Sequence, residues 1–354
     1  MEQGIETTAW ELLDDLAISS GYLKELIEQL ESDFSAADGG YRQLHALVDP
    51  IQRAVVSDQI CMSASAVRSN LVEARLHEQR LSQIVGDSGV PFPAEETYGE
   101  DLRRNAERDM EIIGCTRAMG SALDCLGAVA VGIMRMPRAI TQASFLDIER
   151  VATGKVVAAA TTDQQRAWKG LHELCKAHRE KPPDGWSEWL MDMRNLNVHR
   201  ARQTHIQLQR IRDKHQPQAV VVTSEPEEML KMTARFDLHL RRRPNLPDML
   251  DFISSPSTTD LWIDEPATTT LAGMFIAVNE LVEEAAQLLA SWWRYARKWP
   301  DVFPPPAAKW ALQSPPWPSF GGVAPRATPF PIGKSHVGPL QHERLALAEK
   351  LRKH

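Results

Sequence analysis

One short stretch of the chain, Arg194-Asn195-Leu196-Asn197-Val198-His199, contains residue types that suit the cleavage of an RNA backbone without a metal ion. Such cleavage needs a base that deprotonates the 2′-hydroxyl, an acid for the 5′-leaving oxygen and a cation for the charge on the phosphate. A histidine can act as base or acid at neutral pH because its ordinary pKa is about 6.5. An arginine remains charged and offers a planar pair of donors to phosphate oxygens. We therefore take Arg194, Asn195 and His199 as candidate catalytic residues, with a 2′,3′-cyclic phosphate and a 5′-hydroxyl end as the expected products.

Helix geometry decides how these side chains can meet. Asn195 and His199 are four residues apart and share one helix face, so the Asn195 amide can orient the imidazole. Arg194 lies about 140° around the helix from His199 and has to bend over Val198 to reach the same phosphate. The arginine of one protomer can instead act beside the histidine of a second protomer in a twofold dimer. Val198 and Ile206 are β-branched residues on this otherwise polar face, which is consistent with such pairing, and the sequence predicts a homodimer.

The stretch resembles the R-x4-6-H motif of HEPN domains, in the form in which a polar residue, often asparagine, directly follows the arginine. In that family the domain is a helical bundle, the motif lies on a long helix, and two protomers pair so that their motifs line one cleft. Many members are ribonucleases of toxin–antitoxin, phage-defence, CRISPR-associated or RNA-processing systems. The resemblance covers roughly residues 100–298. It implies a metal-independent endoribonuclease with a toxin or defence role, RNA as substrate, no cofactor, and an antitoxin or another protein as a partner.

The spacing alone has low specificity, because three other pairs in the chain also match R-x4-6-H. Of the four arginines, Arg194 is the one followed by asparagine, and it lies in a predicted long helix whose other face is apolar. One feature of some family members is absent: certain HEPN toxins carry a tyrosine two residues after the histidine, which a partner nucleotidyltransferase modifies, and Ala201 stands there. Control by that route is therefore not expected. The three other pairs are Arg166 with His172, Arg200 with His205, and Arg210 with His215.

The charge of the chain limits how it can bind nucleic acid. A formal net charge of −7 and a pI near 5.9 argue against a general nucleic-acid coat, since unspecific binding to phosphates is mainly electrostatic. The stretch from Arg194 to Lys214 is locally basic, with six Arg or Lys residues against a single acid. We take Arg200 and Arg202 as candidate RNA-binding residues within it. The same charges are also typical of a solvated helix face.

Apolar spacing predicts a mainly α-helical protein. Apolar residues recur at intervals of three and four along much of the chain, which is the pattern of helices with one buried face. Alternating or β-branched runs predict short strands at 219–222, 236–240 and 261–263. The predicted helices span about 10–16, 22–30, 100–136, 163–180, 186–215, 267–298 and 340–353, with further helices between about 41 and 84.

Changes in composition divide the chain into three predicted regions. Residues 1–98 form an N-terminal helical region. Residues 99–299 form a HEPN-like helical bundle, with a small β insertion at 216–265. Residues 300–354 form a tail rich in proline and tryptophan, with a short terminal helix.

Neither a membrane segment nor a secretory leader is predicted. The N-terminus is acidic and lacks a basic region followed by an apolar stretch. The longest uncharged apolar run, about Cys125 to Met134, is much shorter than the roughly 20 residues of a membrane span, and it predicts a buried helix segment. The four cysteines are scattered without a CxxC pair, which favours small buried groups in a reducing, cytoplasmic compartment over a zinc or redox site.

Two other classes of function stay open. The helical bundle can be a non-catalytic dimerisation scaffold whose proline-rich tail binds a protein partner, or an RNA-binding module that does not cleave. Two further motifs fail on their spacing. Gly333-Lys334-Ser335 lacks the first glycine of a phosphate-binding loop, because Thr328 stands there. His172-Glu173 lacks the second zinc-ligating histidine of HExxH, because Lys176 stands there.

Overall fold

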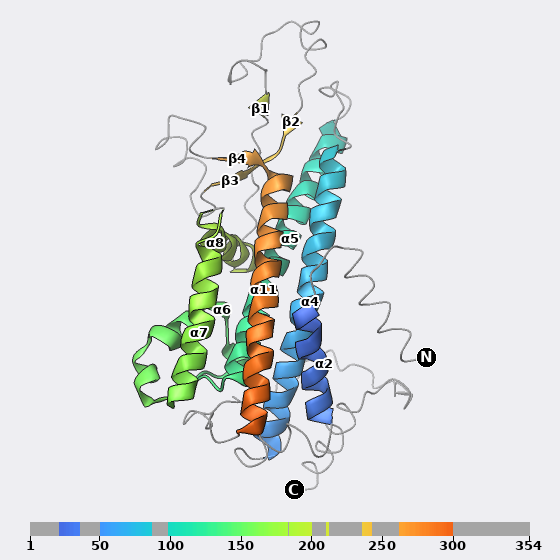
Figure 1. Cartoon of the computed structure of the whole chain (residues 1–354). Coiled ribbons are helices and arrows are strands. Elements are labelled where there is room, and N and C mark those ends of the chain that lie inside the picture. Colours follow the sequence, from blue (N-terminus) through green and yellow to red (C-terminus); the bar gives the residue numbers. More distant parts are fainter. Residues whose placement is uncertain are drawn as a thin grey trace, which may run out of the picture. The chain divides into compact units, whose positions relative to one another are not determined.

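The computed structural model of the chain is mainly α-helical, as the sequence predicts (Figure 1). It describes residues 21–35, 50–86, 98–182, 184–199, 210–211, 236–242 and 262–299. The α-helices are α2 (Gly21–Ser35), α4 (Pro50–Gly86), α5 (Tyr98–Ile133), α6 (Phe145–Thr153), α7 (Thr162–Arg179), α8 (Trp186–His199) and α11 (Ala267–Lys298). The other elements are the 3-10 helices η2 (Ile140–Gln142) and η3 (Lys155–Ala159) and the strands β1 (Arg210–Ile211), β2 (Phe236–Asp237), β3 (His239–Arg241) and β4 (Trp262–Pro266).

The described elements belong to two compact units. The first unit draws on Val67–Leu123 and Leu174–Glu283. The second draws on Gly21–Ala66, on Asp124–Glu173 and on the residues from Glu284 onward. Helices α4, α5, α7 and α11 therefore each contribute one part to each unit.

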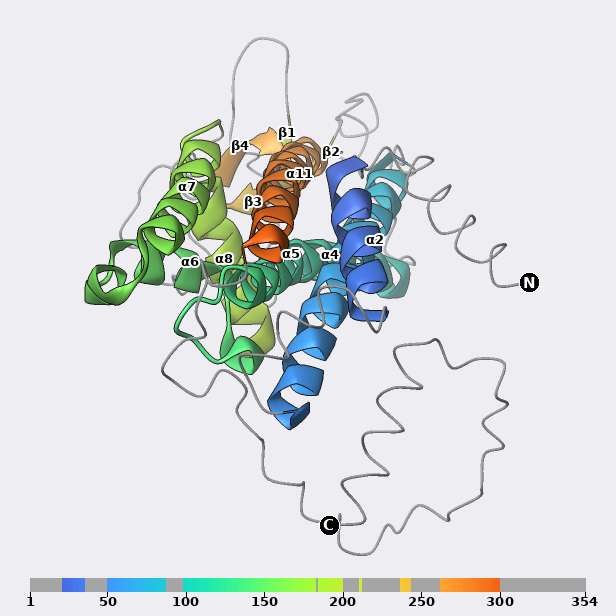
Figure 2. The same cartoon turned by 60° about the horizontal axis from the view of Figure 1, so that its bottom comes forward.

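A buried carboxylate ties α2 to the end of α11 in the second unit. Asp33 accepts a hydrogen bond from the Trp293 indole at 2.7 Å and lies 2.7 Å from Nη1 of Arg297. The rings of Phe34 and Trp293 pack with their centroids 5.3 Å apart. In the same unit α2 lies beside α4 in both views (Figure 1, Figure 2). Both oxygens of Asp33 thus have a partner, which a buried charge requires.

Two tryptophans fix α8 in the first unit. The Trp186 indole donates to the backbone oxygen of His178 at 3.2 Å, and the Trp189 indole donates to the backbone oxygen of Arg241 at 2.8 Å. These bonds tie α8 to the end of α7 and to β3. The apolar stripe predicted for this helix is confirmed over its first part, because Trp186, Trp189, Leu190, Met193 and Leu196 are all buried. Its predicted members Ala201 and Leu208 lie outside the described residues, and Ile211 belongs to β1 instead.

The strands form two short antiparallel pairs in the first unit. Arg210 lies opposite Asp237 in the β1–β2 pair, and His239 lies opposite Pro266 in the β3–β4 pair. The strands predicted at 236–240 and 261–263 are therefore confirmed in β2, β3 and β4.

One predicted helix is too long, and another region is more continuous than predicted. The prediction of a single helix over 186–215 is wrong, because Arg210–Ile211 is a strand. Its partner strand, Phe236–Asp237, lies far along the chain, and a local helical periodicity cannot report a pairing between such distant segments. Helix α4 is one helix from Pro50 to Gly86 instead of several, and proline suits its first turn. The helices predicted at 10–16 and 340–353, the strand at 219–222 and the tail lie outside the described residues.

A long apolar part of α5 does not indicate a membrane protein. Ala106–Ile133 is long and apolar enough to cross a membrane by length and composition. However, 72% of its most apolar window is buried inside the structure, as in the core helix of a folded domain. The buried segment predicted at Cys125–Met134 is confirmed, because Leu126, Val129, Val131 and Met134 are buried.

Candidate functional site

Helix α8 carries the arginine and the asparagine of the predicted motif. Arg194 is half-buried, and its side chain lies against Gly120 of α5. A Cβ atom at Gly120 would be only 2.8 Å from Cγ of Arg194, so the arginine crosses α5 where that helix has no side chain. Nη1 of Arg194 then donates to Oδ1 of Asn195 at 3.1 Å. The structure therefore brings the first two motif residues into direct contact.

The remaining predicted site residues are less fully described. His199 is the last residue of α8, and its side chain lies outside the described part of the structure. Asn195 and His199 remain four residues apart on one helix, as the sequence predicts. Arg200 and Arg202 lie outside the described residues. The meeting of Arg194 with His199 and the second protomer of the predicted dimer stay predictions.

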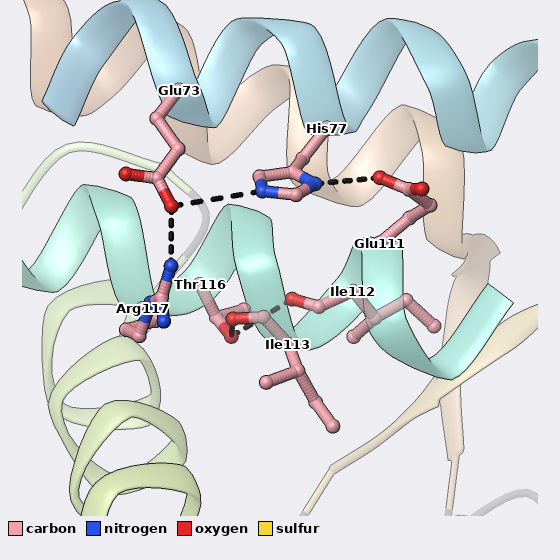
Figure 3. A network of polar contacts seen from close by, with 7 residues as sticks. All are labelled: Glu73, His77, Glu111, Ile112, Ile113, Thr116 and Arg117. Atoms are coloured by element: carbon pink, nitrogen blue, oxygen red, sulfur yellow. Dashed lines mark hydrogen bonds and ion pairs between the residues drawn. The ribbon is translucent and has the colours of Figure 1, made fainter. Parts of the chain in front are cut away.

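A second group of polar side chains, which the sequence did not indicate, links α4 to α5 (Figure 3). Nδ1 of His77 lies 2.6 Å from Oε2 of Glu111, and Nε2 of the same ring lies 3.7 Å from Oε1 of Glu73. The Glu73 carboxylate also accepts a hydrogen bond from Nη2 of Arg117. We call these four residues (Glu73, His77, Glu111 and Arg117) the polar seam.

Two glycines of α5 position the polar seam next to the α8 motif. A Cβ at Gly114 would lie 2.4 Å from Nε2 of His77, so the imidazole rests on bare backbone, as Arg194 does at Gly120. Gly114, Arg117 and Gly120 follow each other at intervals of three, and each interval turns the helix by about 60° in the same direction. Arg117 therefore lies between the face of α5 that contacts α4 and the face that contacts α8. All of these residues belong to the first unit.

The polar seam is open to solvent at its Arg117 end. The exposed fraction of the side chain is 52% for Arg117 and 39% for Glu73, but 30% for His77 and 18% for Glu111. Thr116, the neighbour of Arg117, does not belong to the seam, because its hydroxyl donates to the backbone oxygen of Ile112 at 2.9 Å. The accessible charges are thus a guanidinium and the carboxylate that holds it.

The chemistry available here is anion binding and proton transfer. Arg194 and Arg117 offer planar donor groups suited to phosphate oxygens. Both ring nitrogens of His77 face carboxylates, and both can donate only when the ring carries its second proton. Within the described ranges, no three His, Cys, Asp or Glu side chains come together as metal ligands would.

Three buried cysteines are poor candidates for a nucleophile. Burial raises the pKa of the Cys61 and Cys175 thiols to about 12. Burial, with Glu78 and Glu111 nearby, also raises the pKa of Cys115. Since the thiolate is the reactive form, these residues serve as small apolar core groups, as the sequence predicts.

Comparison of the chain with protein-family models, with curated proteins and with solved structures gave no match. The HEPN resemblance therefore rests on the residues of this chain and their geometry.

Proposed function

We propose that this protein is a metal-independent endoribonuclease of the HEPN type that works as a homodimer in a toxin or defence role. The observation that supports it best is the setting of Arg194, whose side chain crosses Gly120 and whose Nη1 meets Asn195 at 3.1 Å. This Arg–Asn pair is what distinguishes the motif from the other matches to the same spacing. The mainly helical fold agrees with what the resemblance implies.

Each motif residue has a role in the proposed reaction. Arg194 binds the phosphate and stabilises the charge that develops on it. Asn195 restricts the guanidinium, so that less conformational freedom is lost when the phosphate binds. His199 exchanges a proton with the 2′-hydroxyl or with the 5′-leaving oxygen. Attack of the 2′-oxygen on phosphorus breaks the bond to the 5′-oxygen and gives a 2′,3′-cyclic phosphate and a 5′-hydroxyl.

Cleavage of RNA in the presence of EDTA tests this proposal. The purified protein is incubated with labelled transfer RNA, ribosomal RNA and unstructured oligonucleotides, and the ends of the products are identified. We expect His199→Ala to lower the cleavage rate by about 10²–10⁴-fold, the usual contribution of a histidine acid or base. We expect Arg194→Ala to lower it by about 10²–10³-fold, because the developing charge loses a positioned donor.

The chain itself provides matched controls on α7. Arg166 and His172 have R-x4-6-H spacing without the asparagine, so Arg166→Ala and His172→Ala should leave the rate unchanged. Absence of cleavage by the wild type, or full cleavage by both α8 variants, overturns the proposal. Binding of RNA without cleavage would assign the protein to the non-catalytic binding modules instead.

Mixing two inactive variants tests the dimer. If Arg194 of one protomer acts beside His199 of the other, a mixed dimer of Arg194→Ala and His199→Ala chains keeps one intact site. Random exchange of protomers should then restore about a quarter of the wild-type rate. No recovery, with exchange verified by differently tagged chains, would place both residues of a site on one protomer.

A further inference from the structure

The polar seam places a second arginine beside the phosphate-binding residue of the α8 motif. Side chains three residues apart on a helix lie about 5–6 Å apart, which is the separation of Arg117 from position 120 on α5. The Cβ of Arg194 lies 2.9 Å from where a Gly120 Cβ would be. The two arginine side chains therefore begin about one helix turn apart.

The partner of Arg117 is easily displaced. Its guanidinium donates to Glu73, and the exposed fractions of these two side chains are 52% and 39%. Ion pairs this exposed to water are weak, and salt weakens them further. A phosphate diester offers the same guanidinium two acceptor oxygens and a bidentate geometry. An RNA backbone can therefore replace the Glu73 carboxylate.

The rest of the polar seam can hold Glu73 after such an exchange. Oε1 of Glu73 is also 3.7 Å from Nε2 of His77, so the two side chains form an ion pair when the ring carries its second proton. His77 is itself fixed by Glu111 at 2.6 Å and by its contact with Gly114.

We propose that Arg117 is a second RNA-phosphate ligand beside Arg194, and that Glu73 shields it until a backbone phosphate takes its place. This inference rests on the proposed function, because it takes RNA as the ligand. It adds a binding residue from α5 and a competing carboxylate from α4 to the arginine of α8.

Binding of a non-cleavable RNA separates this proposal from a purely structural ion pair. The probe is a fluorescent 2′-O-methyl oligonucleotide, titrated with full-length protein in EDTA at several salt concentrations. We expect Arg117→Gln to weaken binding by about tenfold and to reduce the salt slope by about one, as for the loss of one phosphate contact. We expect Glu73→Gln to strengthen binding several-fold, because Arg117 loses its competitor.

The double variant gives the decisive comparison. If Glu73 acts by occupying Arg117, then Glu73→Gln has no effect in the Arg117→Gln background. An equal gain in both backgrounds would show only a general charge effect and would overturn the shielding role. Arg103 and Glu107 form a similarly exposed pair on α5, 3.4 Å apart, so Arg103→Gln and Glu107→Gln are matched controls that should leave the affinity unchanged.

The outcomes also separate this inference from the proposed function. If Arg194→Ala weakens RNA binding while Arg117→Gln does not, the inference is overturned and the nuclease proposal stands. If the wild type neither binds nor cleaves RNA, both are overturned. Thermal unfolding of each variant confirms that any loss comes from the site, since removal of an exposed pair should barely change Tm.

Discussion

Helices α7 and α8 carry arginine–histidine pairs of similar spacing in different surroundings. The side chain of Arg166 on α7 is 71% exposed, and its Nη1 lies 3.5 Å from Asp163, one turn earlier on the same helix. Arg194 on α8 is half-buried and lies against Gly120 of another helix. Similar spacing therefore gives one solvated arginine and one that tertiary contacts hold in place. Only the second arrangement orients a guanidinium before a phosphate arrives.

The glycines next to the two pairs show the same difference. A Cβ at Gly170, between Arg166 and His172, would meet no atom within 4 Å. A Cβ at Gly120 would strike the side chain of Arg194 at 2.8 Å. A glycine-to-alanine substitution beside each pair can therefore test whether the close contact at Gly120 matters for function, because Gly170 has no such contact.

Among the substitutions that compare the surroundings of the two pairs, Gly120→Ala should have the largest effect on cleavage. The added methyl group displaces Arg194 from its position against α5, and a shift of about 1 Å at a phosphate-binding group lowers the rate by about 10²-fold. The measurement is the rate of RNA cleavage in EDTA, with Tm as a check on folding. In an Arg194→Ala background the same substitution should lower the rate little further, because the guanidinium that it displaces is absent, although the Cβ of residue 194 still lies 2.9 Å from the added methyl group. A large further loss there would mean that Gly120 acts through other contacts.

Asn195→Ala should have an intermediate effect. The substitution removes the acceptor of the hydrogen bond from Arg194, and one such bond contributes about 1 kcal/mol, or roughly fivefold in rate. Asn195→Asp should be less harmful if orientation matters most, because the carboxylate still accepts from the guanidinium. On α7 the residue after Arg166 is Ala167, so that pair has no such acceptor. An unchanged rate for Asn195→Ala would remove the feature that distinguishes α8 from α7.

Much of the fold could be predicted from local sequence patterns. Helix α11 has the predicted bounds, Ala267–Lys298, because its apolar stripe runs without interruption. Helix α7 spans Thr162–Arg179, so each of its ends lies one residue from the predicted end. Helix α6 is not among the predicted helices, although Ser144 and Asp147 form a capping box, a pattern that is visible in the sequence. The signal was present there, but the helix is too short for its periodicity to stand out.

The candidate site could be predicted only within one helix. The pairing of Arg194 with Asn195 follows from adjacency, and the i,i+4 relation of Glu73 and His77 is also visible in the sequence. The contact of Arg117 with Glu73 joins residues 44 positions apart, and no local pattern reports it. The same holds for the close approach of Arg194 to Gly120, which depends on how α8 packs on α5. Local periodicity predicts the helices, whereas the polar seam arises from the packing of α4 against α5.

Gly170→Ala should stabilise the protein slightly and leave the cleavage rate unchanged. Alanine is favoured over glycine inside a helix by about 0.5–1 kcal/mol, and the position has room for the methyl group. We therefore expect a slightly higher free energy of unfolding and an unchanged cleavage rate. Chemical denaturation measures the first and the EDTA assay measures the second. A loss of activity would indicate that the α7 pair takes part in function after all.

Cysteine labelling compares the two arginine positions directly and should disturb the native protein least. The thiols of Cys61 and Cys175 have a pKa near 12, and burial also raises that of Cys115, so none of the three should react with a thiol reagent at pH 8 before unfolding. With the half-buried Cys125 changed to serine, the chain provides a silent background.

In that background, Arg166→Cys should react at the rate of an exposed thiol and Arg194→Cys about tenfold more slowly, because accessibility controls the reaction. Mass spectrometry assigns the labelled residue, and full labelling in denaturant confirms that every thiol is intact. If both positions react equally fast, position 194 next to Gly120 of α5 is as accessible to solvent as position 166 on α7. The contrast between the two helices would then be lost, and with it the reason to prefer the α8 pair as the phosphate site.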